Sequence, residues 1–191
     1  MPTWQDYYKN TKDIPPRKLL VKAVEFVESR DAAIDLGASA LNDAHYLLEQ
    51  GFKKVIAVDK EAVAQEVAAM FPKDNFSYEI SAFEDYQFPQ GVFNIVNAQY
   101  ALPFIAPSEF TRVFKSILNS LHERGVITGQ LFGDRDEWRT KPTMTFHSRT
   151  EAEDLFKGLE ILELTEEEKD APGAVGGVKH WHIFHFIARK L

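Results

Sequence analysis

The chain has 191 residues, enough for a sizeable core, and its formal net charge of −7 argues against a broad electrostatic grip on nucleic-acid phosphates or an anionic membrane. The absence of cysteine excludes disulfides, thiolate zinc sites and cysteine nucleophiles. No apolar run approaches the roughly 20 residues that span a bilayer, and the N-terminus lacks the apolar core of a signal peptide. We therefore expect a cytoplasmic protein with a small-molecule partner, no nucleic-acid or membrane partner, and an oligomeric state that the sequence leaves open.

Residues 1–30 are predicted to form an N-terminal helical segment, because apolar residues between Leu19 and Val27 recur at the spacing of one helical face. Apolar strands then alternate with helical patterns. The first half of this alternation is a strand at 32–36, a helix at 42–51, a strand at 54–59, a helix at 60–71 and a strand at 75–81.

The alternation continues to the end of the chain, with a strand at 92–99, a helix at 107–125, a strand at 125–132, a helix at 150–156, and strands at 159–167 and 179–190. Thr150 and Glu153 have the spacing of a capping box at the last helix. Alternating strands and helices favour a parallel sheet covered on both faces, whereas the last two strands, with no helix between them, should be antiparallel. The predicted fold is α/β: a three-layer α/β/α sandwich with a Rossmann-like, mostly parallel seven-stranded sheet and an antiparallel C-terminal strand, in one domain of residues 1–191.

The first strand carries Asp35 and is followed at once by Gly37, at the edge where open parallel sheets bind ligands and helix N-termini hold anions. Asp59 ends the second strand, where a carboxylate can accept hydrogen bonds from both hydroxyls of an adenosine ribose. Taken alone, each residue is better explained by a tight turn or a helix cap. Their combination at the topological switch of the sheet predicts a nucleoside site.

The stretch IDLGASALNDAHYLLEQGFKKVIAVDK, residues 34–60, resembles the first two motifs of class I S-adenosylmethionine-dependent methyltransferases, which usually write the first as (D/E)xGxGxG. SAFEDYQF at 81–88 resembles their adenine-holding segment, and FNIVNAQYALPFI at 93–105 resembles their motif after strand four. GVITGQLFGDRDEW and KHWHIFHFIARK, at 125–138 and 179–190, resemble the last strands of the small tellurite-resistance-like (TehB-like) branch.

The resemblance implies S-adenosylmethionine as cofactor and S-adenosylhomocysteine as its product. It places Asp35 and Gly37 at the methionine end, Asp59 at the ribose hydroxyls, and Ala82 with Phe83 at the adenine. The other residues that it assigns to cofactor binding are Arg17, Ala38, Ser39, Lys60, Asn97 and Gln99. Asn97 and Gln99 fit either the amino group of the methionine portion or hydrogen bonds to neighbouring backbone, and Arg17 fits either the cofactor carboxylate or the start of a helix. Two positions depart from the family pattern, since Ser81 and Asn94 stand where many members have an acid.

Only the first of the three motif glycines is present, because Ser39 and Leu41 occupy the other two positions. Glycine serves there by allowing positive φ and a close approach of backbone to ligand. The departure leaves two hypotheses: methyl transfer to a small-molecule acceptor, or a noncatalytic module of the same fold that binds a ligand or another protein. The glycine spacing disfavours a nicotinamide-dependent oxidoreductase.

Methyl transfer depends mainly on proximity and orientation, so the catalytic residue stays unknown, and His147 is a candidate general base if the acceptor needs one. His180 and His182 share one strand face, which we expect to meet solvent, and no third ligand completes a metal site, so no metal is predicted. The N-terminal aromatic residues, Trp4, Tyr7 and Tyr8, fit either a cover over the cofactor or an amphipathic helix packed on the sheet.

Overall fold

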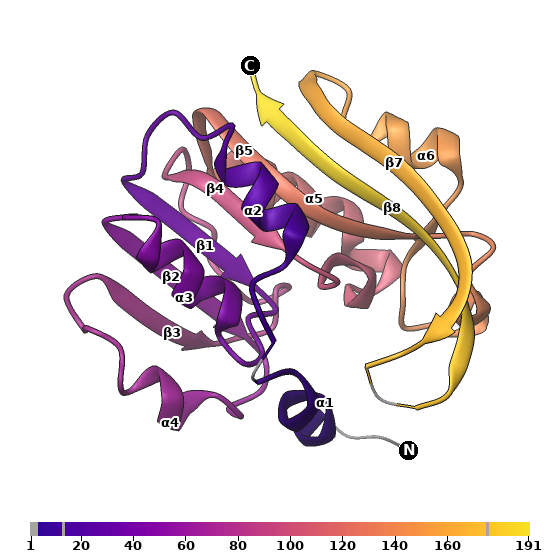
Figure 1. The fold of residues 1–191 in the computed structure, drawn as a ribbon. Coiled ribbons are helices and arrows are strands. Elements are labelled where there is room, and N and C mark those ends of the chain that lie inside the picture. Colours follow the sequence, from indigo (N-terminus) through magenta and orange to yellow (C-terminus); the bar gives the residue numbers. More distant parts are fainter. Residues whose placement is uncertain (1–3, 13, 175) are drawn as a thin grey trace.

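One mixed sheet runs through the middle of the molecule (Figure 1). The computed structural model describes residues 4–12, 14–174 and 176–191. The strands within them are β1 (Ala32–Leu36), β2 (Lys54–Asp59), β3 (Phe76–Ile80), β4 (Phe93–Ala98), β5 (Leu121–Gly133), β6 (Phe146–His147), β7 (Leu159–Pro172) and β8 (Val178–Lys190). Their order across the sheet is β3-β2-β1-β4-β5-β8-β7, and the short β6 pairs with the end of β5.

The five neighbouring strands β3, β2, β1, β4 and β5 are parallel. Strand β8 runs antiparallel to both of its neighbours, β5 and β7. Every residue of β1 and β4 is buried, as parallel strands covered on both faces require. The predicted α/β sheet with an antiparallel C-terminal strand is confirmed. The two-residue β6 is an eighth strand in the described part of the chain, which the prediction of seven did not include.

Helices cover both faces of the sheet, which confirms the predicted three-layer sandwich (Figure 1). The helices of the described residues are α1 (Trp4–Thr11), α2 (Lys18–Val24), α3 (Asn42–Glu49), α4 (Gln65–Ala68), α5 (Pro107–Ser120) and α6 (Arg149–Asp154), with 3₁₀ turns η1 (Leu102–Phe104) and η2 (Glu137–Thr140). α2 and α3 contribute Leu20 and Leu47 to the cluster on one face. No helix in the described part of the chain is long and apolar enough to cross a membrane.

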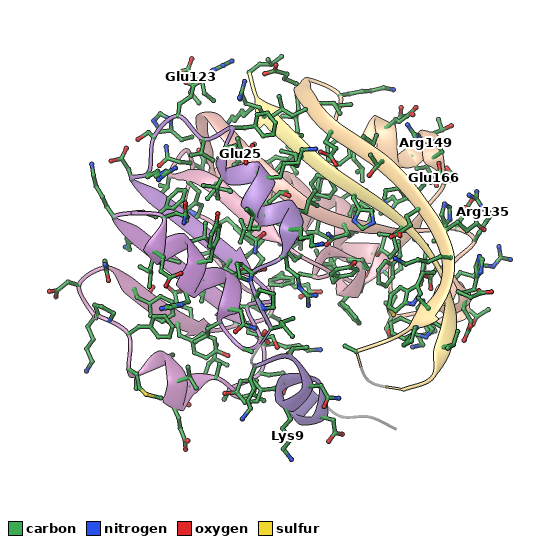
Figure 2. All side chains as sticks on the ribbon, in the orientation of Figure 1. Lys9, Glu25, Glu123, Arg135, Arg149 and Glu166 are labelled. Carbon is green, nitrogen blue, oxygen red and sulfur yellow. The ribbon has the colours of Figure 1, made fainter. Side chains whose placement is uncertain are left out.

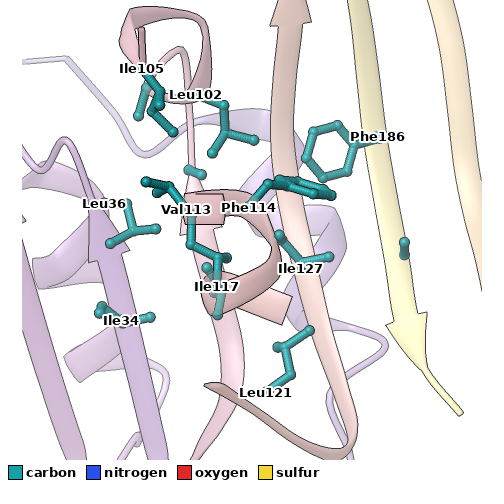
Figure 3. Packing of buried hydrophobic residues seen from close by; sticks show 14 of the residues in the cluster. Ile34, Leu36, Leu102, Ile105, Val113, Phe114, Ile117, Leu121, Ile127 and Phe186 are labelled. Atoms are coloured by element: carbon teal, nitrogen blue, oxygen red, sulfur yellow. The ribbon is translucent and has the colours of Figure 1, made fainter. Parts of the chain in front are cut away.

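α5 provides most of the helical packing on the other face of the sheet. Its apolar residues Val113, Phe114 and Ile117 recur at helical spacing and are at most 3% exposed. Figure 3 shows these side chains packed toward Ile34 of β1 and Ile127 of β5. The first strand therefore lies between two apolar layers, which fixes the position of the loop that follows it.

Three predicted helices are shorter in the structure. The helix predicted over 107–125 ends at Ser120, because Leu121 pairs with Phe93 and begins β5. The helix predicted over 60–71 is reduced to α4, since the Asp59 carboxylate binds the backbone N–H of Glu61 and holds a turn there. The described residues of segment 1–30 form two short helices, because Pro15 and Pro16 favour extended backbone between them.

The predicted capping box of α6 is also wrong. Ser148 is the N-cap: its hydroxyl accepts a hydrogen bond from the Glu151 backbone N–H at 3.3 Å, and the Glu151 carboxylate accepts one from the Ser148 backbone N–H at 2.7 Å. Thr150 and Glu153 lie inside the helix. Both pairs have the same sequence spacing, so the spacing alone did not distinguish them.

Strand β7 forms one edge of the sheet and carries the acidic run at 163–170. The Arg135 guanidinium binds Glu166 at 2.7 Å and Glu168 at 2.8 Å, and Arg149 lies 3.4 Å from Glu166. Figure 2 shows Arg135, Arg149 and Glu166 together beside this edge. Charged side chains on an edge strand disfavour pairing with the strand of another molecule.

Gly129 is required where β5 approaches β4. A Cβ at this position would lie 2.5 Å from the carbonyl oxygen of Ala98, so Gly129→Ala should lower the free energy of unfolding by about 1–3 kcal/mol. Gly177→Ala is the matched control, because no described heavy atom lies within 4 Å of its added Cβ, and it should change stability by less than about 0.5 kcal/mol. Urea denaturation of both variants tests this, and equal stabilities would contradict the close approach.

Candidate ligand-binding site

A small pocket lies at the carboxyl end of β1, where β1 stands between β2 and β4 and the strand order reverses. Its volume is about 40 Å³. The loop between β1 and α3 and the first residues of α3 form one side, and the N-terminal segment forms the other. The lining residues are Thr11, Ile14, Pro15, Arg17, Asp35, Gly37, Ala38, Ser39, Ala40, Asn42, Asp43 and Gln99.

The loop after β1, residues 37–41, has a backbone suited to glycine at three positions. Gly37 has φ +71°, Ser39 has φ +42° and Leu41 has φ +64°. A Cβ at Gly37 would lie 2.9 Å from the Cβ of Ala101, so this position has no room for a side chain. Left-handed backbone costs about 1–2 kcal/mol at a residue with a side chain. Burial of the Leu41 side chain, which is 1% exposed, offsets this cost.

Asp59 at the end of β2 holds this loop in place. One carboxylate oxygen accepts a hydrogen bond from the backbone N–H of Ser39 at 2.8 Å, and the other accepts one from the N–H of Glu61 at 3.0 Å. A carboxylate oxygen can accept two hydrogen bonds, so each retains capacity for a further donor. Asp59 therefore joins the ends of two neighbouring strands and still has acceptor sites.

Two carboxylates, Asp35 and Asp43, share one amide below the pocket. The Asn97 side-chain nitrogen donates to Asp35 Oδ1 at 2.7 Å and to Asp43 Oδ2 at 3.1 Å. Asp43 Oδ1 accepts the backbone N–H of Arg17 at 2.8 Å, whereas Asp35 Oδ2 is buried without a hydrogen-bond partner. Burial and the neighbouring charge of Asp43 raise the pKa of Asp35 well above its usual value, and burial raises the pKa of Asp43.

This arrangement gives the floor of the pocket an excess of acceptors and negative charge. Desolvated carboxylates that repel each other are stabilised by a nearby cation. A positively charged hydrogen-bond donor is therefore the ligand group that the floor fits best.

The residues expected at the adenine lie beside the pocket rather than in its lining. Ala82 and Phe83 follow β3 and are partly buried, and the Phe83 ring lies 3.8 Å from the position that a Gly37 Cβ would take. Lys60 is exposed next to Asp59. The Ser81 hydroxyl donates to the carbonyl oxygen of Ala82 at 2.9 Å, so its proton is used within the segment.

The structure does not bring His147 to the pocket. Its ring packs against Phe110, with 4.7 Å between the ring centroids, and burial lowers its pKa. Asn94 lies at the amino end of β4, at the end of the strands that is opposite to the pocket. Its side-chain oxygen accepts the backbone N–H groups of Asp31 at 3.0 Å and Ala32 at 2.9 Å, so it stabilises the start of β1.

The expectation that His180 and His182 both face solvent is wrong for His182, which is fully buried. The backbone N–H of Arg135 donates to His182 Nδ1 at 3.1 Å, and His182 Nε2 lies 2.8 Å from Glu166. Strand β8 passes beneath the loop that carries Arg135, and this loop covers the imidazole ring of His182. In the ranges that the structure describes, no group of three His, Asp or Glu side chains is placed to hold a metal ion.

Solved structures with the same architecture extend over almost the whole chain. TehB from Haemophilus influenzae has a TM-score of 0.77 at 18% identity, over 99% of this chain and 68% of TehB. An S-adenosylmethionine-dependent methyltransferase from Methanosarcina mazei has a TM-score of 0.67 at 16% identity, over 93% of this chain and 99% of the other. The chain has the fold of S-adenosylmethionine-dependent methyltransferases.

A third structure with the methyltransferase fold contains bound ligands. It is the Burkholderia thailandensis 1,6-didemethyltoxoflavin-N1-methyltransferase with 1,6-didemethyltoxoflavin and S-adenosylhomocysteine, with a TM-score of 0.66 at 17% identity over 91% of this chain and 78% of the other. Comparisons of sequence gave no counterpart: no family model and no curated protein matches the chain. The likeness lies in the fold.

Several residues that line the pocket, and the buried Gln130 behind it, were not predicted from the sequence. Asp43 lines the pocket, and its place just after the loop at 37–41 was a usable signal. Gln130 was not considered, although it is the long polar side chain within the apolar run GVITGQLF. Thr11 and Ile14 gave no signal, because only the folded path of the N-terminal segment brings them to the pocket.

Asp35→Asn should stabilise the free protein. Because the pKa of Asp35 is raised by folding, the folded state binds more protons than the unfolded state above the ordinary pKa of 3.8, and stability falls as pH rises to the raised pKa. The variant removes this penalty and keeps an oxygen for the Asn97 amide. We expect its melting temperature to exceed that of the parent at pH 8 by about 2–4 °C, the change that 1 kcal/mol gives in a domain of this size.

The difference between Asp35→Asn and the parent should shrink as pH falls toward 4. Asp31→Asn is the control, because folding shifts the pKa of Asp31 in the opposite direction: the Lys53 ammonium holds it below its usual value. Removal of this carboxylate should therefore not stabilise the protein. Thermal unfolding followed by circular dichroism between pH 4 and 8 measures both. A constant difference across this range would show that carboxylate ionisation is not the cause.

Proposed function

We propose that the protein is an S-adenosylmethionine-dependent methyltransferase that acts on a small-molecule acceptor. The observation that carries the proposal is the loop after β1. Ser39 and Leu41 retain the left-handed backbone for which the family motif uses glycine, and Asp59 fixes this loop while keeping free acceptor capacity. A loop that had lost its ligand would have no evident reason to keep strained backbone at two residues.

The residues present fit the cofactor at its amino-acid end. Asp35 Oδ2 is a buried acceptor without a partner, and it suits the ammonium group of the methionine portion. Arg17 lines the same pocket and can pair with the carboxylate. In this proposal Gly37, Ala38 and Ser39 lie along the methionine portion.

The remaining assigned residues would hold the nucleoside. Asp59 binds the ribose hydroxyls, Lys60 flanks them, and Ala82 with Phe83 borders the adenine. The pocket of about 40 Å³ is smaller than the cofactor, so entry requires the N-terminal segment that carries Thr11 to move away from the loop. After cofactor entry the segment would return and cover the bound cofactor, which is one of the two explanations that the sequence offers for its aromatic residues.

S-adenosylmethionine, when bound, would supply a sulfonium methyl group for in-line transfer to an acceptor nucleophile, with S-adenosylhomocysteine as the leaving group. The carboxylates of Asp35 and Asp59 orient the two ends of the cofactor, and the N-terminal segment excludes water from the methionine portion. His147 lies outside the pocket, so the proposal gives it no role and assigns no general base. A cytoplasmic location, a one-domain organisation and no nucleic-acid partner belong to the same proposal, consistent with the net charge of −7.

A noncatalytic ligand-binding or protein-interaction module of the same fold is the second candidate. Two observations favour it: side chains replace two motif glycines, and the N-terminal segment reduces the pocket to a small volume. In this alternative, Asp35 and Asp43 are retained from an ancestral cofactor site that the cofactor no longer enters. The two candidates differ in whether S-adenosylhomocysteine binds.

Calorimetric titration with S-adenosylhomocysteine should give measurable binding to the parent protein. Asp59→Ala should weaken it by about 1.5–3 kcal/mol, the scale of hydrogen bonds to a charged group. Asp74→Ala removes one exposed carboxylate outside the pocket and should leave the affinity unchanged. Absence of heat from the folded parent would favour the noncatalytic module, and heat with NADH instead would indicate an oxidoreductase.

Restoring glycine in the loop should separate affinity from stability. Ser39→Gly with Leu41→Gly relieves left-handed strain and widens the pocket beside Ser39, so we expect tighter S-adenosylhomocysteine binding. Loss of the buried Leu41 side chain should lower stability by about 2–4 kcal/mol, as for other large-to-small core substitutions. Ser39→Gly alone should gain affinity without this loss, and weaker binding in that variant would show that the serine hydroxyl is itself a ligand contact.

A further inference from the structure

A buried chain of side-chain amides runs from β5 to the floor of the pocket. Gln130 Nε2 donates to Gln99 Oε1 at 2.8 Å, Gln99 Nε2 donates to Asn97 Oδ1 at 2.9 Å, and Asn97 Nδ2 donates to Asp35 Oδ1 at 2.7 Å. Exposure is 2% for Gln130, 9% for Gln99 and 0% for Asn97. The three amides connect strands β5, β4 and β1 across the sheet.

The direction of this chain is fixed at its first member. The backbone N–H of Tyr100 donates to Gln130 Oε1 at 2.7 Å, and a backbone N–H can only donate. Gln130 must therefore turn its oxygen to Tyr100 and its nitrogen to Gln99. Each following amide then takes the same orientation, because its oxygen must accept and its nitrogen must donate.

Thr128 on β5 supports the same direction independently. Its hydroxyl donates to the carbonyl oxygen of Phe186 at 3.1 Å, so its oxygen is left to accept. Gln99 Nε2 lies 3.5 Å from that oxygen. The Gln99 side-chain nitrogen thus lies between two acceptors, Asn97 Oδ1 and Thr128 Oγ1. If the Gln99 amide were turned around, its oxygen would face these two acceptors without a hydrogen bond.

The last amide of the chain determines what the pocket presents to a ligand. Both hydrogens of Asn97 Nδ2 are directed at carboxylates, one at Asp35 and one at Asp43. The floor therefore offers no donor from this amide. It offers the unpartnered Asp35 Oδ2 and the remaining lone pair of Gln99 Oε1, and both residues line the pocket.

We propose that Gln130, which does not line the pocket, is a positioning residue that sets the direction of the amide chain and thereby makes the floor select a ligand ammonium group. This inference rests on the proposed function, since it concerns the amino-acid end of the same cofactor. A carboxylate or a carbonyl oxygen at this position would meet acceptors only. An ammonium group would meet two, with its charge opposite the buried acids.

Gln130→Glu is the variant that tests the direction of the chain, because it keeps the shape of the side chain. Burial raises the pKa of a carboxyl group at this position, so the variant is compared with the parent at alkaline pH. There the ionised carboxylate accepts from Tyr100 and cannot donate to Gln99. Gln99 must then turn its nitrogen toward position 130, and Asn97 must turn its oxygen toward Asp35. Gln130→Met removes the first link without adding charge and leaves Gln99 directed by Thr128. Thr145→Val is a matched control that loses a different buried hydrogen bond, the one from Thr145 to Ile105.

The measured quantity is the ratio of affinities for S-adenosylhomocysteine and for its analogue without the α-amino group. We expect the parent and Thr145→Val to prefer the amino ligand by at least about tenfold, as a hydrogen bond to a charged group implies. In Gln130→Glu the preference should fall below about threefold, and in Gln130→Met, where Thr128 still directs Gln99, it should fall less. The affinity for 5′-methylthioadenosine, which lacks the amino-acid end, should change less than about twofold in both variants. An unchanged preference in folded Gln130→Glu would overturn the positioning role.

Nuclear magnetic resonance of the free protein tests the chain without any ligand. The side-chain amide protons of Asn97 should shift with pH as Asp35 and Asp43 titrate, and Gln130→Glu should abolish this response. An identical response in the parent and in Gln130→Glu would overturn the inference even if the cofactor binds. An intact response in a protein that binds none of the adenosyl ligands would support the amide direction and reject the proposed function.

Discussion

The hydrogen bond from the Ser39 backbone N–H to the Asp59 carboxylate is the interaction on which the site depends. It joins the loop after β1 to the end of β2, and it holds Ser39 in a left-handed conformation that a residue with a side chain avoids. The parallel pairing of β1 with β2 brings the two residues together, with Leu36 opposite Val58 in the last register pair. The sheet therefore determines the loop conformation, and the loop conformation determines the shape of the pocket.

A second consequence of this geometry is a concentration of negative charge that the free protein does not neutralise well. Asp35 lies within an entirely buried strand, and the charges of Asp43 and Asp59 both raise its pKa. A core that served stability alone would place an apolar side chain at this position. The buried carboxylate is thus a cost to folding that a cationic ligand can reduce, which is the usual balance between stability and function at a binding site.

The sequence predicted the alternation of strands and helices, because apolar patterning and helix signals are local properties. It also predicted Asp35, Gly37 and Asp59 near one another, since strand ends in a parallel sheet meet at one edge. It missed the end of α5 at Ser120, because pairing of Leu121 with Phe93 is a tertiary event. The burial of His182 escaped prediction for a similar reason, as the loop after β5 that covers it is distant in sequence.

The roles of Asn97 and Gln99 required the structure for another reason. From the sequence they were side chains that could meet an ammonium group or bond to neighbouring backbone. The orientation of each amide depends on its neighbours, and the series begins at the Tyr100 backbone N–H, whose position follows from a left-handed residue with φ +55°. Hydrogen-bond direction is a property of the assembled network, so no pattern of residue types contains it.

The N-terminal segment shares its anchoring groups with the pocket floor. The backbone N–H of Arg17 binds Asp43 at 2.8 Å, the Asn42 side chain donates to the carbonyl oxygen of Thr11 at 2.7 Å, and Asn10 donates to Ala174 in the β7–β8 hairpin at 3.1 Å. Movement of this segment would remove the Arg17 donor from Asp43 and leave that carboxylate less compensated. Because Asp43 shares the Asn97 amide with Asp35, such a movement would increase the attraction of the floor for a cation. The position of the N-terminal segment and the charge of the floor would therefore be coupled through Asp43.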